Sequence, residues 1–253
     1  MKKWNKVFFT KAFVSFLLFV FLVGCSNENA KEGKKLIVGT CADFPPYEYF
    51  EDGEIVGIDA EIAKAIGEKL GYEIEIQDMD FSNVLASLES GKIQLGMAGL
   101  TVSDERQKTV DFSESYAKSI QVVLVKKDSG IQTIDDLEGK KIGGQLGTTG
   151  AIYAQDDFGE ENVHLFNKYP EAVLALENEK IDAMILDKIP AEHFAKAAGK
   201  ELILLDSSYT EEDFAIAIPK GKEELLKKVN QAIRELKEDG SLDKIVSKYI
   251  QGE

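Results

Sequence analysis

Residues 98–106, Ala98-Gly99-Leu100-Thr101-Val102-Ser103-Asp104-Glu105-Arg106, follow the run 93–97, which is typical of a buried strand. Ser103 is predicted to cap a short helix, so Arg106 would lie in the first turn of that helix, at the carboxyl end of the strand. The N-terminus of a helix attracts anions and normally carries acidic residues. An arginine at this position indicates that an anionic group binds there. The alternative is an ordinary solvated arginine.

Strand and helix patterns alternate on both sides of this stretch. Strands are predicted at 36–39, 72–77, 93–97, 120–125, 141–145, 163–166, 181–186, 202–205 and 214–218. Helices are predicted at 60–70, 81–89, 148–157, 170–179, 190–198 and 222–238. Asp59 is expected to cap the first of these helices and Gly71 to end it. This alternation predicts an α/β protein in which helices cover parallel sheets.

Two segments of the chain resemble each other at a spacing of 88 residues. Leu88-Glu89-Ser90-Gly91-Lys92-Ile93 matches Leu176-Glu177-Asn178-Glu179-Lys180-Ile181, and each would join the end of a helix to a buried strand. The same spacing places Gly99 on Asp187, both at the carboxyl ends of strands. Ligands of open α/β sheets bind at such ends, so Gly99, Thr101 and Arg106 are expected to face Asp187.

The loop Gly147-Thr148-Thr149-Gly150 lies between a predicted strand and a predicted helix. Its backbone N–H groups and hydroxyls form a candidate cradle for an anion. The loop is too short for a nucleotide P-loop and lacks its lysine. A capped turn, with Thr148 or Thr149 as the N-cap, is compatible with the same residues.

The first 24 residues are typical of an export signal, because a basic start is followed by an apolar run that is short for a membrane span. The run ends in Leu22-Val23-Gly24-Cys25, which resembles the bacterial lipobox, in which the cysteine is lipidated and becomes the mature N-terminus. The alternative is an uncleaved anchor helix. Both place the rest of the chain outside the cytoplasm at a membrane, with residues 25–35 as a flexible linker.

The composition excludes several classes of function. The net charge of −15 disfavours binding to nucleic acid and to anionic lipid headgroups. Once Cys25 carries lipid, Cys41 is the remaining cysteine, which rules out an intramolecular disulfide. His164 and His193 share no ligand spacing with each other or with Cys41, so no metal site is expected.

With these residues placed, the chain resembles the amino-acid-binding proteins of ABC importers, the polar amino acid solute-binding family. The resemblance extends from about Leu36 to Ile250. Its motifs are Asp43-Phe44-Pro45-Pro46-Tyr47-Glu48, Gly57-Ile58-Asp59, Ser90-Gly91-Lys92, Ala98-Gly99-Leu100-Thr101, Glu105-Arg106, Val110-Asp111-Phe112-Ser113, Gly147-Thr148-Thr149-Gly150 and Asp187. Ser115 departs from the family, which usually has a proline there.

The resemblance implies a two-lobed, type II periplasmic-binding-protein-like fold of the α/β class. Each lobe would be a mainly parallel sheet flanked by helices, and two hinge strands would join the lobes. Lobe 1 would comprise residues 36–118 and 214–253, and lobe 2 residues 119–213. The protein would be a monomer attached to the membrane by lipid, including palmitate. It would deliver an amino acid to a membrane permease and would use no cofactor.

The resemblance also implies roles for individual residues. Arg106 would pair with the α-carboxylate of the ligand, assisted by Thr148 and Thr149. Asp187, the Gly99 carbonyl and the Thr101 hydroxyl would bind the α-ammonium. Phe44 and Phe81 would sandwich the ligand side chain, although plain core packing is the alternative for these two rings. Cys41 and Gln145 would also contact that side chain.

Two questions remain open from the sequence. The first is whether the fold carries a dehydratase-like enzyme or a sensory receptor domain; no histidine or glutamate clearly supplies a general acid, which favours binding over catalysis. The second is the ligand side chain. Relatives selective for arginine or lysine often have an acid where this chain has Cys41. We therefore predict a neutral polar ligand such as glutamine or cystine, while Asp43 or Asp80 leaves a basic ligand open.

Overall fold

The computed structural model describes residues 34–199 and 201–250. The predicted export signal, the candidate lipid anchor Cys25 and most of the predicted linker lie outside the described residues. The first strand, β1 (Lys34–Thr40), begins two residues before the predicted strand, so the last two residues of the predicted linker pair in a sheet.

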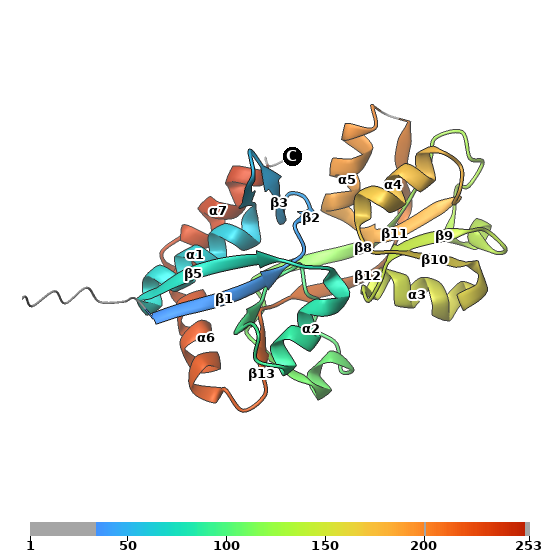
Figure 1. Ribbon diagram of the computed structural model, residues 1–253. Helices are drawn as coiled ribbons and strands as arrows, with labels where there is room; N and C mark the ends of the chain where they lie inside the picture. The colour runs from blue at the N-terminus through green and yellow to red at the C-terminus, as the bar shows by residue number, and fades with distance from the viewer. Residues whose placement is uncertain (1–33, 200, 251–253) are drawn as a thin grey trace, which may run out of the picture. The chain divides into compact units, whose positions relative to one another are not determined.

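The first sheet has five strands in the order β5-β1-β6-β13-β7 (Figure 1). The bounds of its other strands are β5 (Tyr72–Asp78), β6 (Leu95–Gly96), β7 (Val110–Phe112) and β13 (Ala217–Pro219). Four helices and a 3-10 turn belong to this part: α1 (Ile58–Leu70), α2 (Phe81–Glu89), α6 (Glu223–Glu238), α7 (Ser241–Tyr249) and η1 (Arg106–Lys108). A small hairpin sheet adds β2 (Asp43–Phe44), β3 (Glu48–Glu51) and β4 (Glu54–Val56). We call this part lobe 1.

The second sheet repeats the pattern in the order β10-β9-β11-β8-β12. Its strands are β8 (Ala117–Lys126), β9 (Ile142–Gln145), β10 (Val163–Phe166), β11 (Ala183–Asp187) and β12 (Leu202–Phe214). Its helices are α3 (Thr149–Phe158), α4 (Tyr169–Glu177) and α5 (Lys188–Ala197), with short 3-10 turns η2 (Ile134–Leu137) and η3 (Glu160–Asn162). We call this part lobe 2.

The predicted fold class is confirmed, with a refinement in strand direction. In lobe 1 only β13 runs against the other strands, and in lobe 2 only β8 does. Four of the five strands of each sheet therefore share one direction. Each reversed strand pairs with two neighbours, so half of the strand pairings are antiparallel. The reversed strands lie next to the chain segments that pass between the lobes.

The connection between the lobes consists of the segments before β8 and after β12 (Figure 1). Phe214, at the end of β12, pairs with Ala117 of β8 and bridges to Thr101 of lobe 1. β12 extends to Phe214, much further than the predicted strand 202–205, and two register irregularities interrupt it. Those irregularities break the alternation of polar and apolar residues, which explains why the sequence pattern indicated only its first part.

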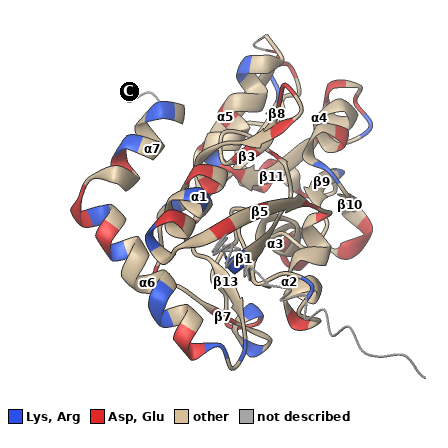
Figure 2. Cartoon of the chain, turned by 60° about the vertical axis from the view of Figure 1, so that its left-hand side comes forward, with Lys and Arg blue, Asp and Glu red and all other residues tan. Residues whose placement is uncertain are grey.

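The helices pack through the apolar faces that the sequence predicted. On α6 the buried residues are Val229, Ala232, Ile233 and Leu236, a spacing of three and four that matches a helical stripe. α1 packs against α6 and α7 as well as β5. Charged residues of both signs are spread over the outer faces of α6 and α7 (Figure 2). Among the described residues, no helix is long and apolar enough to cross a membrane.

The predicted cap at Asp59 is wrong. The helix begins at Ile58, its N-cap position is Gly57, and Asp59 is buried inside the first turn. Its carboxylate accepts hydrogen bonds from the N–H of Gly99 and the hydroxyl of Tyr116 instead. These partners lie 40 and 57 residues away in the chain, so no local pattern pointed to them.

The repeat at a spacing of 88 residues is present in the fold. α2 begins at Phe81 and ends at Glu89, and α4 begins at Tyr169 and ends at Glu177. The strands that follow, β6 and β11, begin at Leu95 and Ala183, which keeps the same spacing. The two lobes therefore present equivalent helix–strand units.

Candidate functional site

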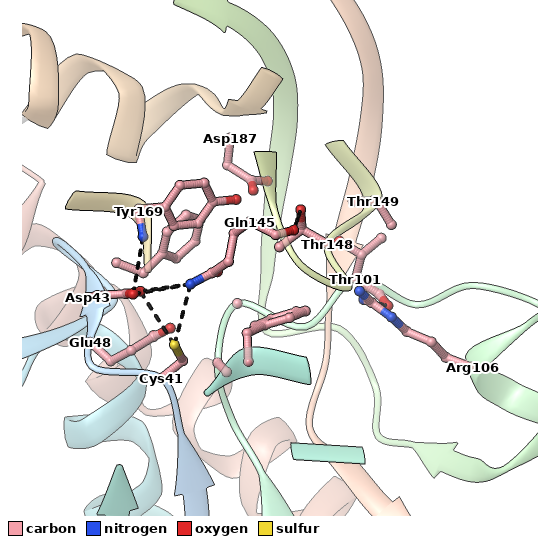
Figure 3. A pocket seen from close by; sticks show the side chains of 14 residues that line it. Cys41, Asp43, Glu48, Thr101, Arg106, Gln145, Thr148, Thr149, Tyr169 and Asp187 are labelled. Carbon is pink, nitrogen blue, oxygen red and sulfur yellow. Dashed lines mark hydrogen bonds between the residues drawn. The ribbon is translucent and has the colours of Figure 1, made fainter. Parts of the chain in front are cut away.

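All ten ligand-binding residues predicted from the sequence line one pocket. Asp43, Glu48, Ala98 and Tyr169 complete the lining, which comes from both lobes (Figure 3). Asp80, one of the two acids considered for a basic ligand, does not line it.

Gly99 is placed at the pocket by a backbone turn that a side chain would prevent. Its φ is +55°, and a Cβ atom there would lie 2.8 Å from the ring of Phe44. Its N–H donates to Asp59, as noted above. Gly99 follows the end of β6, as the sequence predicted.

Arg106 is buried, with 7% of its surface exposed. The predicted helix is the 3-10 turn η1, and its N-cap position is Glu105 instead of Ser103. The hydroxyl of Ser103 still accepts a hydrogen bond from the N–H of Arg106. Its guanidinium donates to the carbonyls of Thr101 (2.7 Å) and Gly147 (3.0 Å), the second across the lobes. No salt bridge to a described residue involves it, and burial lowers its pKa. A buried guanidinium that bonds only to carbonyls is suited to an anionic ligand group.

Glu212 of β12 is a buried carboxylate that the sequence analysis missed. It accepts hydrogen bonds from Thr101 (2.8 Å), Thr149 (3.0 Å), Gln121 (2.9 Å) and Tyr153 (2.7 Å). The Thr101 hydroxyl can still accept a bond from an ammonium, because it uses its proton on Glu212. The Thr149 hydroxyl cannot also donate to a ligand carboxylate, which differs from its predicted role.

The loop before α3 behaves as a cap and retains free donors. Thr148 is the N-cap: its hydroxyl accepts from the N–H of Ala151 and donates to the carbonyl of Gln145. The hydroxyl of Thr148 is therefore also engaged within the protein. The N–H of Thr149 lies in the first helical turn, where N–H groups have no acceptor within the helix. This N–H can assist Arg106 in binding a carboxylate.

Asp187 lies at the end of β11 and is 5% exposed. It occupies the N-cap position of α5, but its side chain makes no capping bond to that helix. The hydroxyl of Ser119 donates to it in a short hydrogen bond. Burial raises the pKa of Asp187 to about 7, and the nearby Glu212 adds to the shift. The carboxyl group thus favours a cationic partner in the pocket.

Asp43 of lobe 1 accepts hydrogen bonds from lobe 2 at the end of the pocket opposite Arg106 (Figure 3). It accepts from Gln145 Nε2 (3.1 Å) and from the N–H of Tyr169 (3.2 Å), both in lobe 2. Burial raises its pKa to about 6. Cys41 lies beside it, 3.4 Å from Lys168 Nζ, and burial raises the pKa of the thiol to about 12. The amide donors of Gln145 are used on Asp43 and on the carbonyl of Asn167.

Both aromatic residues of the predicted sandwich, Phe44 and Phe81, line the pocket, and each also contacts another side chain. Phe44 stacks on Tyr169, with ring centroids 5.1 Å apart and planes at 21°. Phe81 lies under the guanidinium of Arg106, and the guanidinium carbon is 5.5 Å from the centre of the Phe81 ring. Sequence analysis missed Tyr169, yet the repeat could have found it, because Tyr169 is 88 residues after Phe81 and opens the equivalent helix.

Residues with metal-ligating side chains do not gather in the described part of the chain: no group of three or more His, Cys, Asp or Glu could hold an ion. The pocket instead offers a buried guanidinium and carboxyl groups, from two lobes that two segments connect. These features define a two-lobed binding protein for a small ligand that carries both charges.

Comparison with known proteins supports this class. The family model of the bacterial extracellular solute-binding proteins, family 3, matches residues 36–252. The chain therefore belongs to this family.

Individual relatives bind different amino acids. The chain is 38% identical over 263 residues to the arginine-binding extracellular protein ArtP of Bacillus subtilis, covering 100% of both chains. It is 33% identical over 223 residues to the L-cystine-binding protein TcyJ of Escherichia coli, covering 87% of this chain and 84% of that one. A solved ancestral arginine-binding protein bound to glutamine is similar with a TM-score of 0.82 and 37% identity, covering 86% of this chain and 98% of the other.

Proposed function

We propose that this protein captures a free polar amino acid between its lobes outside the cytoplasm and delivers it to the permease of an ABC importer. The observation that carries this proposal is Arg106, a buried guanidinium in the pocket that bonds only to backbone carbonyls. A ligand α-carboxylate would supply the missing anion. The relatives described above support the same ligand class: two are binding proteins for arginine and for cystine, and the third is an ancestral arginine-binding protein with glutamine bound.

Each charged end of the ligand has its own partners. Arg106 and the first turn of α3 bind the carboxylate. Asp187, the Gly99 carbonyl and the Thr101 hydroxyl bind the ammonium. Because both charges must lose their water together, each needs a hydrogen-bonded partner in the closed pocket. Partners on both lobes make closure depend on the ligand, so the ligand shifts the population towards the closed form that a permease recognises.

The membrane attachment is part of the proposal. The sequence Leu22-Val23-Gly24-Cys25 supports lipidation of Cys25 after removal of residues 1–24. The lipid would hold the binding protein, as a monomer, close to its permease, with residues 25–35 as the tether.

The proposal is tested by a thermal-shift screen of the twenty amino acids, followed by calorimetry of those that respond. Bound ligand is first removed by partial unfolding and refolding. A ligand at about 100 times its Kd is expected to add about 2.7 kcal/mol to the free energy of unfolding. Polar amino acids should raise the melting temperature while leucine and phenylalanine do not. A screen in which no amino acid shifts the melting temperature would overturn the proposal.

A further inference from the structure

The charge of the pocket is unbalanced. Its lining holds three carboxyl groups, Asp43, Glu48 and Asp187, against the single guanidinium of Arg106. In the proposed function Asp187 binds the α-ammonium of the ligand. Asp43 already has donors from lobe 2, and Lys168 acts on it electrostatically. Glu48 is the one acid of the lining that neither the α-groups of the ligand nor a hydrogen bond accounts for.

Glu48 is buried, and no N–H group or hydroxyl of the described residues donates to its carboxyl group. It opens β3, pairs across the hairpin with Phe44, and is 1% exposed. Neither of its carboxyl oxygens has a hydrogen-bond partner in the described structure. Figure 3 shows it beside Asp43 and Cys41, away from Arg106. A buried ionised carboxylate without a partner costs several kcal/mol, so Glu48 must be neutral until a cation reaches it.

The neighbour of Glu48 is Asp59. Asp59 is also 1% exposed, and one of its oxygens accepts from the Gly99 N–H (3.0 Å) and the Tyr116 hydroxyl (2.8 Å). Its other oxygen has no partner unless the two carboxyl groups bond to each other. That bond requires a proton, since two adjacent carboxylates cannot both stay ionised. The two donors favour Asp59 as the ionised member and leave the proton on Glu48.

The surroundings reinforce this assignment. Burial raises the pKa of Glu48 well above its usual range, and Asp59, Cys41 and Asp43 raise it further. Burial raises the pKa of Asp59 to about 6, while Gly99 and Tyr116 hold it down. Tyr47 and Tyr116 also face the pair and stay protonated, because burial raises their pKa values too.

The nearby lysine does not neutralise the pair. Lys168 contacts the thiol of Cys41, the Asp78 carboxylate and the Met79 carbonyl, each at 3.4 Å, and makes no hydrogen bond or salt bridge to Glu48 or Asp59. The groups that act most strongly on Glu48 are all acidic. A cation that enters the pocket would therefore meet an acid with no positive partner of its own.

We propose that the Glu48–Asp59 pair holds one proton in the empty pocket and exchanges it for the cationic side-chain group of a basic amino acid. The O–H bond of Glu48 breaks, the proton passes to the buffer, and the ionised carboxylate pairs with the guanidinium or ammonium of the ligand. Binding of a basic amino acid thus releases one proton more than binding of a neutral one. This inference rests on the proposed function and names the ligand class as cationic.

The test compares arginine with citrulline, its neutral analogue of the same shape, on the wild-type protein. Calorimetry at pH 7.5 in phosphate and in Tris, whose ionisation enthalpies differ, counts the protons released. The α-groups of both ligands draw the same proton from Asp187, so that contribution cancels. Arginine is expected to release about one proton more than citrulline. If citrulline does not bind, the neutral amino acid that binds most tightly in the screen replaces it. If arginine does not bind, lysine replaces it.

The variant Glu48→Gln keeps the shape of the side chain and removes the ionisable group. It should lose at least tenfold in arginine affinity and the extra released proton, while the affinity for the neutral ligand changes less than threefold. Glu51→Gln, at the exposed end of the same strand, is the control and should change neither. The melting temperature of each variant shows whether the variant is folded. The comparison of arginine with citrulline uses the wild-type protein, so it remains a test even if a variant does not fold.

The outcomes separate the two proposals. Equal proton release by arginine and the neutral ligand, or unchanged arginine affinity in Glu48→Gln, would overturn this inference. Binding of neutral amino acids alone would also overturn it and would leave the proposed function standing. Failure of every amino acid to bind would overturn both.

Discussion

Arg106 shows how much the function depends on single side chains. It is one of only two arginines in the chain, and the other, Arg234, forms an exposed ion pair with Glu114 on the surface. A guanidinium buried among carbonyls contributes little to folding by itself, because desolvation opposes its hydrogen bonds. We infer that Arg106 is buried at this position in order to bind an anionic group of the ligand.

Arg106→Ala is expected to weaken amino-acid binding by about 2–5 kcal/mol, because the ligand carboxylate is then buried without its charged partner. Calorimetry with the tightest ligand of the screen measures the loss. Arg234→Ala is the matched control and should bind as the wild type does, since an exposed pair contributes about 0–1 kcal/mol to stability and lies outside the pocket. Wild-type affinity in Arg106→Ala would remove this residue from the site.

Asp187 makes binding depend on pH. Its pKa is raised to about 7 by burial, so below that pH it is neutral in the empty pocket and must lose a proton to meet the ammonium. Affinity for a neutral amino acid should be highest near pH 8 and fall as the pH drops through 7, towards tenfold per unit. The range from pH 8 to 7 bears mainly on Asp187, because burial raises the pKa values of Asp43 and Asp59 less, to about 6.

Calorimetry across this range measures the effect, and Asp187→Asn should bind more weakly with a flat profile. The stability of the empty protein has the opposite sign. The folded state holds this proton more tightly than the unfolded state, so the contribution of Asp187 to the free energy of unfolding falls as the pH rises from about 4 to 7. A wild-type affinity that is the same at pH 8 and pH 6.5 would contradict the assignment.

At the scale of elements, α3 is held unusually close to its sheet. A Cβ atom on Gly150, in the first turn of α3, would lie 2.6 Å from the carbonyl oxygen of Ile185 in β11 and 2.8 Å from the side-chain oxygen of Gln121 in β8. The absence of a side chain therefore sets the distance between the N-terminus of α3 and the strand that carries Asp187.

Gly150→Ala should move that helix end outward. Overpacking costs about 1–3 kcal/mol, and the better helix propensity of alanine recovers up to about 1. We expect a lower free energy of unfolding in urea and weaker ligand binding together. Ile152→Ala, on the exposed face of the same helix, is the control and should change both by less than about 0.5 kcal/mol. If Gly150→Ala matched this control, close packing of α3 would not position the site.

At the scale of the whole molecule, the fold joins two equivalent lobes and the proposed lipid anchor attaches them to the membrane. Cys25→Ser is expected to abolish lipidation and signal cleavage at this site, because serine lacks the thiol that accepts the lipid. Mass spectrometry of the membrane fraction measures the N-terminal species. Cys41→Ser, the change at the other cysteine of the chain, is the control and should leave lipidation intact. An unmodified mature N-terminus at another residue would refute the anchor.

The sequence by itself determined the elements that rest on local periodicity. The stripe on α6, the strand–helix alternation and the turn at Gly99 were predicted because their residues interact with near neighbours along the chain. The resemblance to the solute-binding family also predicted ten of the fourteen residues that line the pocket. Short strands such as β2 and β7 were missed, because two or three residues show no period.

Tertiary structure alone decided how those pocket residues are used. Asp59 accepts hydrogen bonds from the N–H of Gly99 and the hydroxyl of Tyr116. Glu212 accepts hydrogen bonds from the hydroxyls of Thr101 and Thr149. These contacts join residues 40 to 111 positions apart, so they depend on where the lobes and the irregularities of β12 bring the side chains. The buried Glu48, to which no N–H group or hydroxyl donates, becomes visible only there, because a missing donor is a property of a packed interior and not of a stretch of sequence.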